Sequence, residues 1–124
     1  MSNSPFLAID HVQLAMPAGG EDTARRFFVD LCGMIVVPKP AELAKRGGCW
    51  FRSGIVEMHL GVEQDFRPAR KAHPALVCTN YVALIAKLKA AKVSVKEDFK
   101  IPAIRRSHIL DPFGNRIELI ANPA

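Results

Sequence analysis

Two histidines and two glutamates stand in strand-like segments that lie far apart in this 124-residue sequence. His11 and His73 each open such a segment, and Glu57 and Glu118 each lie within another. Neutral imidazole and carboxylate groups are good ligands for divalent transition metals such as Zn²⁺, Ni²⁺, Mn²⁺, Fe²⁺ or Co²⁺. Two imidazoles and two carboxylates leave coordination positions open for a substrate, which favours Lewis-acid or proton-transfer catalysis. This chemistry requires a fold that brings the four side chains together.

The elements that could position these residues occur twice in the same order. In each half, a strand is followed by a helix with an apolar stripe and then by three short strands. The sequence therefore predicts an α+β fold in one domain, 1–124, with module one at about 6–62, a linker at 63–72 and module two at about 73–122. The predicted strands are 9–15, 34–38, 48–52 and 55–60, then 73–78, 93–96, 104–110 and 116–121, and the stripes are Ala24, Phe27, Phe28 and Leu31, then Tyr81, Leu84, Ile85 and Leu88.

Strand alternation predicts that the ionisable residues share the faces that the helices do not cover. Glu57 and His59 lie opposite the apolar residues of 55–60, and Glu118 lies opposite the apolar residues of 116–121. A single β-α-β-β-β module cannot bury its second sheet face alone. We expect two modules, from one chain or from two, to form a cupped mixed sheet around a central cavity.

Four segments resemble the vicinal oxygen chelate superfamily, which includes glyoxalases, bleomycin-resistance proteins, fosfomycin-resistance enzymes and extradiol dioxygenases. The resemblance covers nearly the whole chain and implies the glyoxalase/bleomycin-resistance fold, usually as a homodimer with a metal in the cavity. The matching segments are Ile9-Asp10-His11-Val12, Arg26-Phe27-Phe28 with Leu31-Cys32-Gly33-Met34, His73-Pro74-Ala75-Leu76, and Asp111-Pro112-Phe113-Gly114-Asn115-Arg116-Ile117-Glu118-Leu119.

The resemblance also implies roles for individual residues. His11, His73 and Glu118 match the family's metal ligands, and Glu57 matches the position of a fourth. His59 could replace Glu57 as a ligand, act as a base or bind substrate. If only three residues bind the metal, Glu57 or His59 is free for proton transfer, and Glu57 and Glu118 are the candidate proton shuttles.

Other residues are candidates for the walls of a substrate pocket. The predicted substrate-binding residues are Gln13, Trp50, Arg52, Arg67 and Phe113. Alternation allows only one of Trp50 and its neighbour Phe51 to face the cavity. Arg105 and Arg106 are interpreted mainly as surface residues, with clamping of an anionic substrate as the alternative. His108 is interpreted as a partly exposed histidine, with a place near the cavity or its rim as the alternative.

The favoured function is a divalent-metal-dependent, glyoxalase-like lyase or isomerase that moves a proton next to a carbonyl of a small vicinal-oxygen substrate. One alternative is a metal-free, bleomycin-resistance-like protein that binds a drug or metabolite. Another is a fosfomycin-resistance-type thiol transferase or a dioxygenase. Two histidines facing two glutamates would be a costly lining for a dry apolar pocket, which favours the enzyme.

The amino-acid composition limits the kinds of binding partner that we expect. Hydrophobic residues make up 49% of the chain and charged residues 23%, as in an ordinary globular protein. The net charge of +5 is spread along the chain, without a nucleic-acid-binding motif. No apolar run approaches the ~20 residues of a membrane span, and no secretory signal is visible, so we expect a cytoplasmic protein with no membrane or nucleic-acid partner. The odd number of cysteines, three, argues against a disulfide framework.

Overall fold

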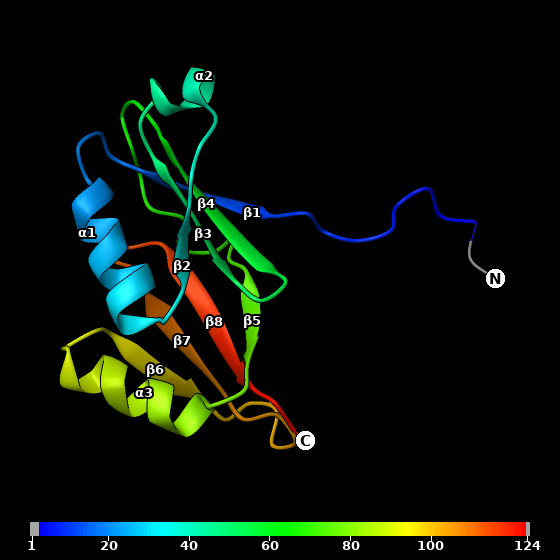
Figure 1. Cartoon of the computed structure of the whole chain (residues 1–124). Coiled ribbons are helices and arrows are strands. Elements are labelled where there is room, and N and C mark those ends of the chain that lie inside the picture. Colours follow the sequence, from blue (N-terminus) through cyan, green and yellow to red (C-terminus); the bar gives the residue numbers. More distant parts are fainter. Residues whose placement is uncertain (1–2, 124) are drawn as a thin grey trace.

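The chain folds into two modules of the same topology, as the computed structural model shows for residues 3–123 (Figure 1). The first strand of each module pairs in parallel with the last one, and the other pairs are antiparallel. The two sheets have the orders β1-β4-β3-β2 and β5-β8-β7-β6, so the predicted α+β fold of two β-α-β-β-β modules is confirmed. The elements are β1 (Val12–Met16), α1 (Glu21–Arg25), η1 (Arg26–Leu31), β2 (Ile35–Val37), α2 (Ala41–Ala44), β3 (Cys49–Ser53), β4 (Val56–Val62), β5 (Ala75–Cys78), α3 (Tyr81–Ala90), β6 (Val95–Asp98), β7 (Arg106–Leu110) and β8 (Arg116–Ala121).

The helices bury the apolar stripes that the sequence predicts. In the first module α1 continues as the π-helical turn η1, and Phe27 and Phe28 are buried there. Gly33 follows with a φ of 75°, a left-handed conformation that ends the helix at little steric cost. In the second module Tyr81 and Leu88 are buried on α3. None of the helices in residues 3–123 has the length or the apolar content to cross a bilayer.

Both modules share one apolar core. The helices α1 and α3 lie on the same side of the two sheets (Figure 1), and the apolar faces of the strands pack against them. Burying one large apolar side chain stabilises a fold by about 1.5–3 kcal/mol, so this shared core holds the modules together. Its fully buried large side chains are Met16, Phe51, Met58, Leu60, Leu88, Ile109 and Ile117.

The strands begin later than predicted at the two histidines. Ladder pairing of β1 starts at Val12, so His11 lies just before the strand. Pairing of β5 starts at Ala75, because Pro74 has no backbone N–H to donate. The carbonyl of Pro74 still accepts a hydrogen bond from the Glu118 backbone, which keeps His73 beside that residue. The remaining strands overlap their predicted ranges, whereas the short helix α2 was not predicted.

Asn115, in the turn between β7 and β8, joins the two modules. Its fully buried side-chain amide donates hydrogen bonds to the carbonyl of Ala15 in β1, at 2.8 Å, and to Asp111. Its side-chain oxygen accepts a bond from the backbone N–H of Ala69, in the segment between the modules. One side chain therefore fixes β1 and this segment against the sheet that carries Glu118.

Candidate functional site

His73 and Glu118 form a close pair on the second module. His73 Nε2 lies 3.1 Å from Glu118 Oε1, and His73 Nδ1 lies 2.7 Å from the carbonyl oxygen of Lys71. A carbonyl only accepts hydrogen bonds, so Nδ1 carries a proton and Nε2 of the neutral ring carries a lone pair. Two acceptor atoms 3.1 Å apart then face each other, and a cation between them, either a proton or a metal ion, makes the contact favourable. This arrangement fits a pair of metal ligands.

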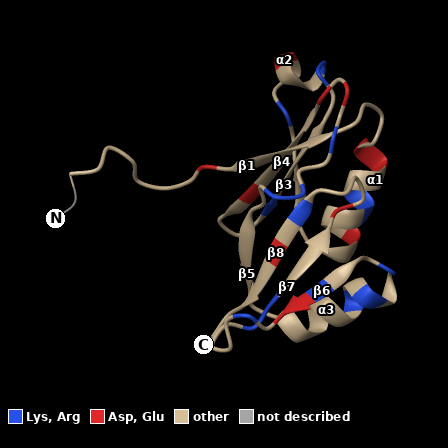
Figure 2. Cartoon of the chain, turned by 180° about the vertical axis from the view of Figure 1, so that it is seen from behind, with Lys and Arg blue, Asp and Glu red and all other residues tan. Residues whose placement is uncertain are grey.

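The second oxygen of Glu118 belongs to an ion-pair network. Arg106 Nη1 donates to Oε2 of Glu118 at 3.1 Å, and Arg106 Nη2 lies 3.0 Å from Asp98 Oδ2. Burial raises the pKa of the Glu118 carboxyl, but the neighbouring His73 and Arg106 outweigh burial and leave the pKa below its usual value. Glu118 is therefore a carboxylate at neutral pH. Figure 2 shows acidic and basic residues side by side on β6, β7 and β8.

His108 lies next to this pair, on the neighbouring strand. Arg116 Nε donates to Nδ1 of His108 at 2.8 Å, so the ring proton of neutral His108 is on Nε2. That Nε2 atom is buried without a hydrogen-bond partner in residues 3–123 and lies 3.9 Å from Glu118 Oε1. Burial lowers the pKa of His108, and the Arg116 charge lowers it further. Neutral His108 is thus a donor toward the pair, not a metal ligand.

The sequence interpretation missed the part that β6 and β7 play here. Arg106, His108 and Asp98 lie on the face of Glu118, because His108 pairs with Glu118 across β7 and β8, and Asp98 pairs with Arg106. Alternation within 104–110 does place Arg106 and His108 on one face. The register that sets them against Glu118 depends on the loops between the strands and was not readable from alternation.

The first module holds a second polar cluster. The ring of His59 is stacked between the rings of Trp50 and His11, with centroid distances of 4.1 and 3.9 Å. His59 Nε2 lies 2.7 Å from Glu57 Oε2, so an ordinary N–H bond satisfies this pair. His11 Nδ1 lies 2.9 Å from Asp10 Oδ2. This carboxylate holds the proton on Nδ1 and leaves Nε2 of His11 available to a metal, as for His73.

The four predicted metal ligands thus fall into two separate sets. Glu57 and His11 belong to the cluster around His59, and His73 and Glu118 belong to the cluster on the second module. Within residues 3–123 no three His, Cys, Asp or Glu side chains are close enough to hold a metal ion. One chain alone therefore does not bring His11 to the His73–Glu118 pair.

Three of the five predicted substrate-binding residues, Gln13, Trp50 and Arg52, lie on strands of the first module. Trp50 lies on the polar face, while its neighbour Phe51 is fully buried in the core. The Gln13 amide lies over Gly61 on that face, because a Cβ atom at Gly61 would be 2.5 Å from Gln13 Nε2. Arg52 pairs in register with Glu57 and is exposed.

The other two predicted residues lie in segments outside the strands. Arg67 is exposed in the segment between the modules. The ring of Phe113 packs edge-on against Phe66 and beside Gly20, against the core. The role of both residues in substrate binding stays a prediction.

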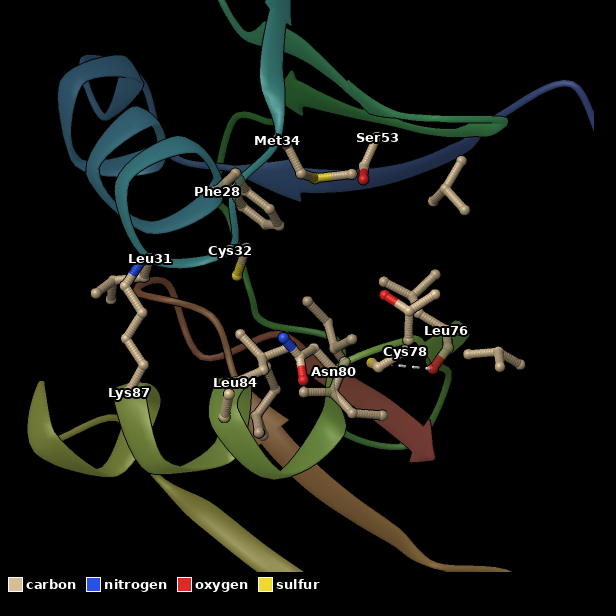
Figure 3. A pocket seen from close by; sticks show the side chains of 18 of the residues that line it. Phe28, Leu31, Cys32, Met34, Ser53, Leu76, Cys78, Asn80, Leu84 and Lys87 are labelled. Carbon is tan, nitrogen blue, oxygen red and sulfur yellow. Dashed lines mark hydrogen bonds between the residues drawn. The ribbon is translucent and has the colours of Figure 1, made fainter. Parts of the chain in front are cut away.

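An apolar groove lies between the modules (Figure 3). It has a volume of about 600 Å³ and is bordered by η1, the β3–β4 turn, β5 and α3. The thiols of Cys32 and Cys78 line it, and all three cysteines are free. Burial raises the pKa of Cys32 to about 12. The groove holds none of the histidines or glutamates that carry the candidate chemistry.

Comparison with known proteins identifies solved structures that are similar to this chain. No family model matches the sequence, and no curated protein matches it. A crystal structure of a protein assigned to the glyoxalase family from Bacillus anthracis is 46% identical, with a TM-score of 0.92, over 98% of this chain and 99% of that one.

Two more distant structures share the fold. A lactoylglutathione lyase from Agrobacterium tumefaciens is 19% identical, with a TM-score of 0.69 and 96% of each chain covered. A fosfomycin resistance protein from Listeria monocytogenes is 14% identical, with a TM-score of 0.73 and 94% of each chain covered. The fold, the paired modules and the 46% identity agree with the resemblance seen in the sequence. The chain belongs to the glyoxalase family of the vicinal oxygen chelate superfamily.

Proposed function

We propose that this protein is a divalent-metal-dependent, glyoxalase-like lyase or isomerase acting on a small vicinal-oxygen substrate. The observation that carries the proposal is the His73–Glu118 pair, whose facing atoms are both acceptors when the ring is neutral. A transition-metal ion between a nitrogen and an oxygen ligand satisfies both atoms. His11 presents the same free Nε2 atom, held by Asp10, and completes a set of two histidines and one glutamate.

The proposal includes a homodimer, because one chain does not bring the three ligands together. His11 of one copy would join His73 and Glu118 of the other. Two copies related by a twofold axis then form two equivalent sites. A small molecule as substrate belongs to the proposal, and the cytoplasmic location stays a prediction.

Glu57 is assigned to proton transfer. Its Oε2 is held by His59 at 2.7 Å, which leaves Oε1 free to accept a proton from a substrate carbon and return it to the adjacent carbon. His59, packed between Trp50 and His11, keeps the carboxylate in place. When bound, the ion would supply Lewis-acid polarisation of the substrate oxygens, which makes the neighbouring C–H acidic.

Elemental analysis of protein purified without an affinity tag tests this function. We expect about one transition-metal ion per chain in the wild type, and loss of most of it in His73→Ala. His108→Gln is the matched control, because His108 Nε2 carries a proton and is not a ligand; this variant keeps its metal. Metal-free wild type, or equal metal content in His73→Ala, would falsify the assignment.

An activity assay then tests the reaction class. We expect the metal-loaded wild type to consume the hemithioacetal of methylglyoxal and glutathione, or another 2-oxoaldehyde adduct. Glu57→Gln is expected to keep its metal and lose about 10²–10⁴-fold in kcat, the usual contribution of a general base. Unchanged kcat in this variant would remove Glu57 from proton transfer.

One observation favours a second candidate, a metal-free binding protein. Arg106 already forms an ion pair with Glu118, so the carboxylate has a cationic partner without a metal. Such a protein would bind an aromatic drug or metabolite against Trp50. Tight binding of an aromatic ligand by metal-free wild type, without turnover, would support this candidate.

A further inference from the structure

A hollow opens at the edge of the second sheet, beside the His73–Glu118 pair. It has a volume of about 360 Å³ and borders β6, the segment after it, β7 and β8. His108 forms the wall between the hollow and the pair, since its ring centroid lies 5.7 Å from that of His73. The hollow is lined by Lys96, Glu97, Asp98, Phe99, Lys100, His108 and Arg116.

The basic side chains of the hollow lack carboxylate partners. Within residues 3–123, no Asp or Glu oxygen forms an ion pair with Lys96, Lys100 or Arg116. Asp98 is already engaged, since it pairs with Arg106 and accepts a bond from the Lys100 backbone N–H. Glu97 lines the hollow too, and Arg106 is shared between Asp98 and Glu118, so three cations face two carboxylates, of which Asp98 already has a partner.

Arg116 is held in place by groups that carry no negative charge. Its guanidinium donates to His108 Nδ1 at 2.8 Å and to the carbonyl oxygen of Arg70 at 3.5 Å. Arg116 stands two residues before Glu118 on the same strand, so both side chains lie on one face. A fixed, uncompensated guanidinium next to the candidate metal pair favours an oxyanion.

We propose that this hollow binds an anionic group of the substrate, a carboxylate, phosphonate or phosphate, through Arg116 and Lys96. The inference rests on the proposed function, because it assigns the vicinal oxygens of the same substrate to the His73–Glu118 pair. His108 lies between the two regions, and its buried Nε2–H has no hydrogen-bond partner in residues 3–123, with Asp98 Oδ2 at 3.5 Å and Glu118 Oε1 at 3.9 Å. We therefore expect the substrate to be a small oxygenated molecule whose acidic group is separated from its reacting end by the His108 ring.

Binding of inorganic phosphate and of malonate by isothermal titration calorimetry tests the hollow. We expect saturable binding to the wild type that weakens as salt is added. Lys96→Gln and Arg116→Gln are each expected to weaken binding by about tenfold, the order of one charge-assisted hydrogen bond. Lys89→Gln, on the exposed face of α3, is the matched control and binds like the wild type.

Each outcome has a defined meaning. Phosphate binding without malonate binding supports the hollow and identifies a phosphoryl or phosphonyl group, and the reverse identifies a carboxylate. Equal binding by Lys96→Gln, Arg116→Gln and Lys89→Gln overturns the proposal, because the anion then responds only to surface charge. Lys96 is exposed, so its variant tests the hollow even if Arg116→Gln folds poorly.

The same titration in two further states separates this inference from the proposed function. His73→Ala is expected to lose the metal and keep phosphate binding, and Lys96→Gln is expected to keep the metal and bind phosphate about tenfold more weakly. Chelator-treated wild type should still bind phosphate. A metal-free wild type that binds phosphate at the hollow would defeat the proposed function alone, and a metalloprotein without anion binding would defeat this inference alone.

Discussion

The hydrogen bonds behind each histidine ring determine what its other nitrogen can do. Lys71 O holds the proton of His73 on Nδ1, and Asp10 does the same for His11. Arg116 has the opposite effect on His108, because it donates to Nδ1 and leaves the proton on Nε2. Residue type alone would make all three rings equal candidates for ligands, and their partners separate them.

Burial also governs the cysteines. Burial raises the pKa of Cys32 to about 12 and of Cys49 to about 11, and it raises the pKa of Cys78 as well. At pH 8 only about one Cys32 in ten thousand is then a thiolate, against about a quarter of free cysteines. We expect iodoacetamide to modify the native protein far more slowly than the denatured protein.

Mass spectrometry of alkylated protein at pH 8, with and without denaturant, checks this expectation. The native rate should rise about tenfold per pH unit between pH 8 and 10, because each unit multiplies the thiolate fraction by ten. The unfolded thiols ionise from about pH 8.5, so stability contributed by these thiols falls as the pH rises above that value. Rapid alkylation of native Cys32 at pH 8 would contradict the burial argument.

At the scale of elements, β4 and β8 present their glutamates on equivalent positions but with different neighbours. Arg52 pairs with Glu57 across β3 and β4, and His108 pairs with Glu118 across β7 and β8. The alternation of β4 and β8 was predictable, because it depends only on apolar residues at every second position. The π-helical turn η1 was not, since it needs one extra residue per turn, which an apolar stripe does not reveal.

The segment from Asp111 to Asn115 belongs to the most specific family signature in the sequence, and in the structure it connects separate parts of the chain. Asn115 hydrogen-bonds to Asp111 within this segment, to Ala15 in β1 and to Ala69 between the two modules. A motif match could not show this role, because the partners lie 46 and 100 residues away in the chain.

Replacement of Asn115 should therefore destabilise the fold. Asn115→Ala removes the part-buried hydrogen bonds to the Ala15 carbonyl and the Ala69 N–H, and we expect a loss of about 2–4 kcal/mol in the free energy of unfolding. Urea denaturation followed by circular dichroism measures it. Asn80→Ala is the control, because Asn80 is exposed and makes no capping bond to α3. Equal stability of the two variants would show that Asn115 does not join the modules.

At the scale of the whole molecule, the arrangement of modules decides whether a site exists. The repeated order of elements predicted that His11 and His73 occupy equivalent positions in the two modules. How the modules pack against each other depends on long-range contacts, which no local pattern encodes. In the structure the segment before β1 runs away from the body of the molecule (Figure 1), and Phe6, Leu7 and Ile9 on it are exposed. His11 stands at the base of this segment, where a second copy can reach it.

Mixing two inactive variants tests sharing of the site between copies. His11→Ala and His73→Ala are each expected to be inactive alone. If each site takes His11 from one copy and His73 from the other, random mixed dimers restore about a quarter of the sites. Activity and metal content after mild denaturation and refolding of the mixture measure this recovery. No recovery, with both variants folded and dimeric, would place all ligands within one chain.

The two modules share one topology but carry unlike surfaces. The first has stacked rings, and the second has an ion-pair network. Two equal surfaces would hold a small molecule equally well in two orientations related by a half-turn. Unlike surfaces remove that equivalence, because the apolar and charged ends of the molecule can no longer exchange places. A protein built from near-copies thereby fixes which end of an asymmetric substrate faces which module.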